Sequence, residues 1–167
     1  ITPRTRLIFL NSPSNPTGAA YTSAELHALG AVLRRHPDVL IATDDMYEHI
    51  VWAKEPFCSF LTACPDLYDR TVTINGVSKG YAMTGWRIGY CGGPATIIDA
   101  MSTIQSQSTS NPSSIAQKAA VVALNGDQAC VAEMNQHFKA RHDFFNAGLN
   151  ALPGFRVLPA AGTFYAW

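Results

Sequence analysis

One lysine lies in a small-residue loop between two stretches that are typical of β-strands. The first run, Thr71 to Ile74, ends at the turn dipeptide Asn75-Gly76, and Lys79 follows it. The second run, Trp86 to Cys91, contains Arg87. A partly desolvated ammonium gives up its proton more easily and becomes a nucleophile toward a carbonyl, and a guanidinium is suited to phosphate. A Schiff-base lysine near a phosphate-binding arginine indicates pyridoxal phosphate, although a surface lysine and an ordinary strand arginine fit the same spacing.

Two polar side chains follow the apolar run from Val39 to Thr43. Asp44 comes directly after it, where backbone N–H groups and a helix dipole would keep a carboxylate ionised. Such a carboxylate suits a protonated ring nitrogen, and the phenol of Tyr47, three residues on, can donate to an oxyanion on the same ring. A helix N-cap and a core tyrosine are the structural alternatives. Asp44 and Asp45 do not predict a metal site, because no third ligand falls at the required spacing.

The segment from Asn11 to Gly18 is predicted to be a loop, because Pro13 and Pro16 exclude both a helix and a central strand. Asn15 offers an amide donor restricted by the proline that follows it, and a plain turn is the alternative. The sequence contains no GxxxxGK or GxGxxG phosphate loop, no GxSxG nucleophile turn and no HExxH zinc pattern.

Apolar periodicity and turn residues predict alternating strands and helices. Strands are expected at 5–10, 39–43, 68–74, 86–91 and 155–158, with a last one over 162–167. Helices are expected at 22–35, 97–104, 115–124 and 127–152. Thr22 and Glu25 form a capping box for the first helix, and Asp127 is the expected cap of the last. The apolar side of that last helix is predicted to contain Val131, Met134, Phe138, Phe145 and Leu149.

Strands separated by helices imply right-handed crossovers and a mostly parallel sheet. Such sheets bind ligands at the carboxyl ends of their strands. Four polar residues come just after predicted strands, and we expect them to share a pocket: Asn15, Asp44, Tyr47 and Lys79.

Composition excludes several classes of protein. The 167 residues fit one domain, and 12 basic and 12 acidic side chains give a net charge of zero, which indicates neither nucleic acid nor membrane as a partner. No apolar run approaches the roughly 20 residues of a membrane span, and no signal peptide is evident. The four cysteines form no CxxC pair, so reduced thiols in a cytoplasmic protein are expected. A Cys58–Cys64 disulfide is an alternative that nothing in the sequence supports. The histidines are expected at the surface or on helix faces: His27, His36, His49, His137 and His142.

Four motifs occur together in one order: Asn11 to Gly18 (NSPSNPTG), Asp44 to Tyr47 (DDMY), Ser78-Lys79, and Met83 to Tyr90 (MTGWRIGY). With these motifs the chain resembles the fold-type I pyridoxal-phosphate enzymes, specifically the class I/II aminotransferases of the aspartate aminotransferase kind.

The resemblance covers nearly the whole chain and implies an α/β fold, a three-layer sandwich around a mostly parallel sheet. It implies that residues 1–126 are part of the large domain that binds pyridoxal phosphate. Residues 127–152 would be a linking helix, and residues 153–167 would begin a small α+β C-terminal domain.

The resemblance also implies roles for the site residues. Lys79 would form the Schiff base with the cofactor aldehyde and move the proton between the substrate α-carbon and the cofactor. Asp44 would pair with the pyridinium nitrogen. Asn15 and Tyr47 would hydrogen-bond the phenolic oxygen of the ring.

Ser78 and Arg87 would hold the cofactor phosphate, while Gly76 stands where many relatives have a phosphate-binding serine. The segment from Ser110 to Pro112 resembles one that reaches the active site of a partner subunit, which implies a homodimer. The family's N-terminal phosphate loop and ring-stacking aromatic would precede Ile1, and its carboxylate-binding arginine would follow Trp167. The chain alone is therefore expected to be a fragment with little activity.

The leading hypothesis is transfer of an amino group between an amino acid and a 2-oxo acid. β-Elimination or decarboxylation with the same cofactor stays open, because the residues that decide among these reactions lie largely outside the chain. The ligand-sensing domain of a transcription regulator is an alternative of another class. A degenerate homologue kept for dimerisation is a third, and the presence of Lys79, Asp44, Tyr47 and Arg87 counts against it.

Overall fold

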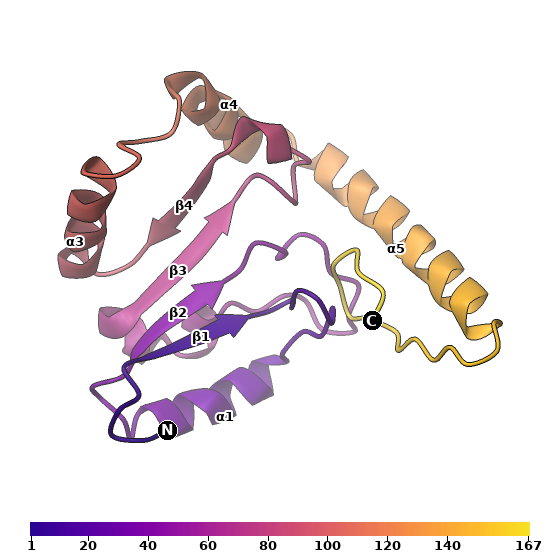
Figure 1. The fold of residues 1–167 in the computed structure, drawn as a ribbon, viewed down its shortest axis with the longest axis horizontal. Coiled ribbons are helices and arrows are strands. Elements are labelled where there is room, and N and C mark those ends of the chain that lie inside the picture. Colours follow the sequence, from indigo (N-terminus) through magenta and orange to yellow (C-terminus); the bar gives the residue numbers. More distant parts are fainter.

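The computed structural model describes all 167 residues and is built around a four-stranded sheet (Figure 1). The strands lie side by side in chain order: β1 (Leu7–Asn11), β2 (Leu40–Asp44), β3 (Thr71–Gly76) and β4 (Gly89–Gly92). β1 pairs with β2 and β2 with β3 in parallel, whereas β4 is antiparallel to β3. The predicted α/β fold with a mostly parallel sheet is confirmed.

The connection between β3 and β4 contains no crossover helix, which explains the antiparallel edge. It contains only a 3₁₀ turn, η2 (Thr84–Trp86), so the chain turns back along β3. The prediction of a strand from Trp86 is therefore wrong at its start. Trp86 ends η2, and Arg87 has a left-handed backbone with φ of 51°, so pairing begins only at Gly89.

The prediction that β3 begins at Tyr68 is also wrong. Residues Pro65–Arg70 form a second 3₁₀ helix, η1, because proline favours the first position of a helical turn. The strand starts at Thr71, and Asn75-Gly76, expected to be a turn, remains paired with Gly89 and Tyr90 of β4.

The chain forms five α-helices: α1 (Ser23–Leu33), α2 (Phe60–Ala63), α3 (Ala95–Ser106), α4 (Ser114–Asn125) and α5 (Ala129–Asn150). The capping box of α1 is confirmed, since the Thr22 side chain accepts from the Glu25 N–H and the Glu25 carboxylate accepts from the Thr22 N–H. Gln128, and not Asp127, is the N-cap residue of α5, although Asp127 accepts a hydrogen bond from the Ala129 N–H.

The core fills the space between the first two strands and the helices beside them. Figure 1 shows α1 along β1 and β2, and α3 and α4 near β4 at the opposite edge. The buried core residues are Leu10, Leu26, Leu33, Val39, Ile41, Phe60, Ala63, Cys64 and Leu67. This packing holds β1 and β2 firmly, and their carboxyl ends with them.

Arg70 joins the end of α1 to the start of β2, because its guanidinium donates to the backbone carbonyls of Leu33, His36 and Val39 at 2.6–2.8 Å. Replacing Arg70 with alanine leaves these acceptors without a partner and is expected to lower the free energy of unfolding by about 2–4 kcal/mol. Urea denaturation measures this change. Arg35→Ala, at an exposed position on the same connection, is the control and should cost less than about 0.5 kcal/mol.

The C-terminal part departs most from the predictions. Residues 155–158 form no strand, because the Asn150 side chain bonds both backbone groups of Val157 at 2.9 Å and takes the place of a partner strand. Residues 162–167 contribute only an isolated bridge between Gly162 and Val51.

The predicted apolar side of α5 is correct at Val131 and wrong at Phe145, which is 58% exposed. The buried side contains His142 and Asn146 instead, so of the two places expected for His142, the surface or a helix face, the structure shows a helix face. No helix has the length and apolar composition to cross a membrane.

Candidate functional site

The loop that contains Asn15 is fixed to the carboxyl ends of β1 and β2 by Asn11. Asn11 is the last residue of β1 and lies in register with Asp44, the last residue of β2. Its side-chain amide donates to the Asp44 carbonyl at 3.3 Å, and its amide oxygen accepts from the Asn15 N–H at 2.7 Å. Asn11 was not predicted as a site residue, although its place at the end of a strand in the NSPSNPTG motif was a usable signal.

Asp44 and Tyr47 lie close together at this edge. One carboxylate oxygen of Asp44 accepts from the Met46 N–H at 3.1 Å, which orients the side chain. Burial raises the pKa of Tyr47 well above its ordinary value, and the hydrogen bond to Tyr165 and the charge of Asp44 add to the rise. A hydrogen bond from Asn15 opposes it. The structure thus brings Asn15, Asp44 and Tyr47 near one another.

Lys79 follows β3 and faces an aromatic ring. Its ammonium nitrogen lies 5.7 Å from the centre of the Phe164 ring, which is itself 5.6 Å from the centre of the Tyr47 ring. Lys79 lines an open pocket of about 250 Å³ with Ser78, Ala82, Thr84, Phe138 and Phe164. Lys79 and Tyr47, from two different strand ends, therefore flank the same ring.

Arg87 lies beside this pocket. Its guanidinium donates to the carbonyl of Thr84, a pocket residue, at 2.8 Å, and the rest of its fork is exposed. The left-handed backbone at Arg87 is uncommon for a residue with a side chain and is found more often at functional sites. The prediction that Arg87 lies within a strand is wrong. Ser78 lines the pocket, and Arg87 is joined to it through the Thr84 carbonyl.

Gly76 is buried where β3 meets β4. A Cβ there would lie 3.1 Å from both the Gly89 Cα and the Met46 Cε, closer than atoms normally approach. Gly76, where the resemblance would lead one to expect a serine, thus lies in a tight pairing of β3 with β4. A serine at this position would require β4 or Met46 to shift.

The C-terminal segment, residues 160–167, was not predicted to contribute to the site. Its backbone is fixed by hydrogen bonds from Ala161 and Gly162 to the Gly18 carbonyl and from Thr163 to the Ile50 carbonyl. Tyr165 then meets Tyr47, hydroxyl to hydroxyl, at 2.5 Å. No local signal could have shown this, because the two tyrosines are 118 residues apart in the chain.

Asp45, the residue that follows Asp44, is buried. Burial raises its pKa from an ordinary 3.8 to about 7, and the negative charge of Glu48 contributes. From about pH 4 to pH 7 the folded state retains a proton that the unfolded state releases, so stability falls as the pH rises.

The free energy of unfolding of Asp45→Asn should therefore be about 2–4 kcal/mol higher than that of wild type at pH 8 and nearly equal to it at pH 4. Denaturant titrations at both pH values test this, and a variant less stable at pH 8 would contradict it.

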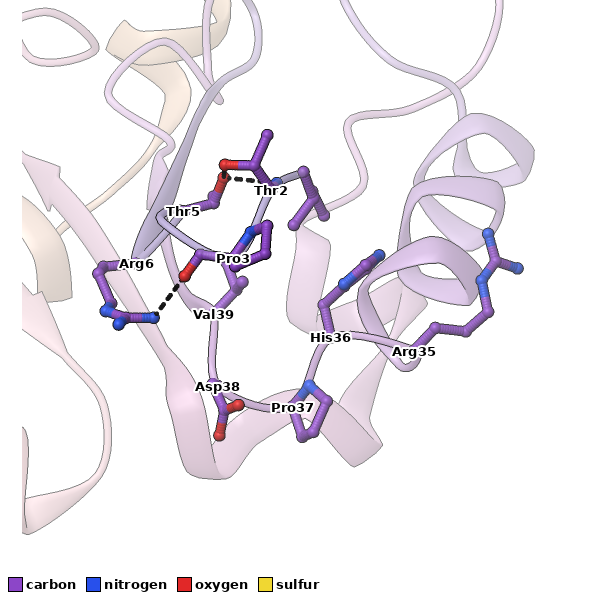
Figure 2. Close-up of a pocket in the computed structure, with 10 residues that line it drawn as sticks. Thr2, Pro3, Thr5, Arg6, Arg35, His36, Pro37, Asp38 and Val39 are labelled. Atoms are coloured by element: carbon purple, nitrogen blue, oxygen red, sulfur yellow. Dashed lines mark hydrogen bonds between the residues drawn. The ribbon is translucent and has the colours of Figure 1, made fainter.

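Another hollow lies at the opposite end of the sheet. Residues 1–6 and 35–39 enclose about 250 Å³ there, with the Arg6 guanidinium turned toward the Pro3 carbonyl (Figure 2). None of the predicted site residues lines it. No group of three His, Cys, Asp or Glu side chains is arranged to hold a metal ion, and all four cysteines are free.

Comparison with known proteins gives consistent matches over the chain. A family model described as aminotransferase class I and II matches residues 1–167. The aspartate/prephenate aminotransferase of Nitrosomonas europaea is 62% identical over all 167 residues, which make up 42% of that relative. The aspartate aminotransferase of Rhizobium meliloti is 53% identical over 100% of the chain and 41% of its own length.

Solved structures agree. The crystal structure of a Rhizobium meliloti aspartate aminotransferase has a TM-score of 0.96 at 54% identity, covering 99% of this chain and 42% of the other. An aspartate aminotransferase from Thermus thermophilus gives 0.90 at 40% identity, with 99% and 43% covered. The chain thus spans about two fifths of the length of the relatives that it matches.

Proposed function

The chain belongs to the family of class I and II aminotransferases, and on this premise we propose that the whole protein transfers an amino group between an amino acid and a 2-oxo acid with pyridoxal 5′-phosphate. The observation that supports this most is the meeting of Lys79 and Tyr47, from the ends of two parallel strands, around the Phe164 ring, with the charge of Asp44 acting on Tyr47. Parallel sheets bind ligands at that edge.

The residues present fit the cofactor by their chemistry. Bound pyridoxal phosphate supplies an electron sink for the carbanion formed at the substrate α-carbon. The Asp44 carboxylate is an acceptor for the ring N–H, and the Asn15 amide and Tyr47 phenol are donors for the ring oxygen. Ser78 and the exposed part of the Arg87 fork suit a phosphate dianion. The amine of Lys79 is the group that would bond the cofactor's aldehyde carbon.

Lys79 is also the base that we propose moves the substrate proton. Its amine is half-buried and borders the open pocket, so it reaches both the protein interior and an entering ligand. The Phe164 ring lies 5.7 Å from the Lys79 nitrogen and 5.6 Å from the Tyr47 ring, so it borders the amine on that side. The hydrogen bond between Tyr47 and Tyr165 fixes the phenol that would bind the ring oxygen.

The relatives narrow the proposed substrates. Their names give aspartate and prephenate, and the Thermus thermophilus structure contains maleate, a dicarboxylate. We propose a dicarboxylic amino acid as amino donor.

A homodimer also remains our proposal. Three apolar side chains on or beside α3 and α4 are more than 70% exposed (Ile104, Ile115 and Val122), and they flank the loop at Ser110 to Pro112. Exposed apolar groups of this kind mark surfaces covered by other protein. The division into residues 1–126, 127–152 and 153–167 and the cytoplasmic location likewise remain predictions.

An absorbance spectrum of the full-length protein with pyridoxal phosphate tests the function. We expect a band near the visible edge that shifts on addition of aspartate and returns on addition of a 2-oxo acid. A band that shifts without returning, with release of ammonia or carbon dioxide, would instead indicate elimination or decarboxylation. A protein that binds no pyridoxal phosphate would refute the proposal.

A further inference from the structure

His142 on α5 is a buried polar residue that the proposed chemistry does not use. Its side chain is 6% exposed, whereas that of His137 on the same helix is 63% exposed. The Trp52 ring packs against it with ring centres 5.1 Å apart. A buried imidazole requires hydrogen-bond partners, and these partners define its state.

The hydrogen bonds fix the tautomer of His142. The Ala160 backbone N–H donates to the ring Nε2 at 2.9 Å, and the Asn146 amide nitrogen lies 3.0 Å from the same atom. A backbone N–H can only donate, so Nε2 is the acceptor and the ring proton is on Nδ1. Nδ1 lies 3.2 Å from one carboxylate oxygen of Asp143, and the Lys139 ammonium donates to the other oxygen.

Ala160 is the first residue of the C-terminal segment. Its N–H is held by His142, and its carbonyl accepts from the Trp52 indole N–H at 2.9 Å. Four and five residues further on, Phe164 meets Lys79 and Tyr165 meets Tyr47. His142 therefore joins α5 to the start of the segment that completes the candidate site.

We propose that His142, as the neutral imidazole protonated on Nδ1, is a positioning residue that holds Phe164 and Tyr165 at Lys79 and Tyr47 through Ala160. It contacts none of the residues proposed to bind the cofactor. The expected effect of His142 on cofactor binding rests on the proposed function. Its expected effect on the order of residues 160–167 does not.

Two substitutions in the full-length protein separate positioning from packing. His142→Leu keeps an apolar side chain and removes the acceptor, while His142→Gln places an amide oxygen near the position of Nε2. We expect amide hydrogen exchange over residues 160–163 to accelerate about tenfold in His142→Leu and to stay within about twofold of wild type in His142→Gln. Pyridoxal phosphate should bind about five- to tenfold more weakly to the leucine variant only. His137→Leu is the control and should change neither quantity.

Unchanged exchange over residues 160–163 in a folded His142→Leu protein would overturn the proposal, as would equal acceleration in the glutamine variant. If the His142→Leu protein does not fold, the NMR chemical shifts of the two ring nitrogens of His142 in wild type test the proposal instead. Protonated Nδ1 with unprotonated Nε2 supports the proposal, and protonated Nε2 overturns it. A wild-type protein that binds no pyridoxal phosphate would contradict the proposed function alone, because the exchange and NMR measurements need no cofactor.

Discussion

Replacing Lys79 with alanine is expected to remove the visible absorbance of the cofactor-loaded protein and to reduce amino-group transfer by about 10⁴-fold. The substitution removes the only amine in the pocket beside Ser78 and Thr84, and with it both the nucleophile and the base. Far-UV circular dichroism should stay as in wild type, since the Lys79 side chain makes no hydrogen bond or ion pair and its backbone carbonyl, which accepts from the Ala82 N–H, is kept by the substitution. The measurements are an absorbance spectrum and a coupled turnover assay with aspartate and a 2-oxo acid.

Two controls make this result specific. Lys54→Ala removes an exposed lysine outside the pocket and should leave the spectrum and the turnover unchanged. Lys79→Arg retains the positive charge but offers no amine for the aldehyde, so it should fail as the alanine variant does. Near-normal turnover in Lys79→Arg would show that the residue supplies only charge.

Replacing Gly18 with alanine is expected to lower the free energy of unfolding by about 3–5 kcal/mol and to detach the C-terminal segment from the site. Gly18 has φ of 67°, a conformation that disfavours any side chain. A Cβ there would overlap the Ala160 side chain and lie 2.7 Å from the Gly162 carbonyl oxygen. Because the Gly18 carbonyl also accepts from two N–H groups of that segment, the strain would reach Phe164 and Tyr165.

The control for Gly18 is the same substitution at Gly148. Gly148 lies within α5 with open space where its Cβ would be, so alanine there should stabilise the protein by about 0.5–1 kcal/mol. Thermal unfolding measures both variants. A Gly18→Ala protein as stable as wild type would contradict the close approach between the Asn15 loop and the C-terminal segment.

The sequence predicted the parts of the fold that depend on local signals. The Thr22–Glu25 capping box specified the start of α1, and the apolar periodicity of α3 and α4 specified those helices. The loop residues Asn15, Asp44, Tyr47 and Lys79 were expected at strand ends because parallel strands direct their carboxyl ends to one edge. The structure places them at or just after these strand ends, but Asn15, Asp44 and Tyr47 do not line the pocket beside Lys79 that was expected to contain all four.

The errors in the C-terminal part arise from hydrogen bonds that composition and periodicity do not reveal. Phe155 to Leu158 has the composition of a strand, but Asn150 occupies the Val157 backbone groups. The apolar pattern of α5 indicated Phe145 as buried, whereas His142 and Asn146 are buried and His142 bonds the Ala160 N–H. Tyr165 and Phe164 reach the site only through backbone bonds to residues more than 100 positions earlier.

Peptide mapping of the full-length protein after borohydride reduction in the presence of pyridoxal phosphate tests most directly whether these strand ends form one cofactor site. We expect the pyridoxyl group on Lys79 alone among Lys54, Lys79, Lys118 and Lys139, with the label lost in Lys79→Ala. A label on any other lysine, or a Lys79→Ala protein that is still labelled to the same extent, would contradict the site described here.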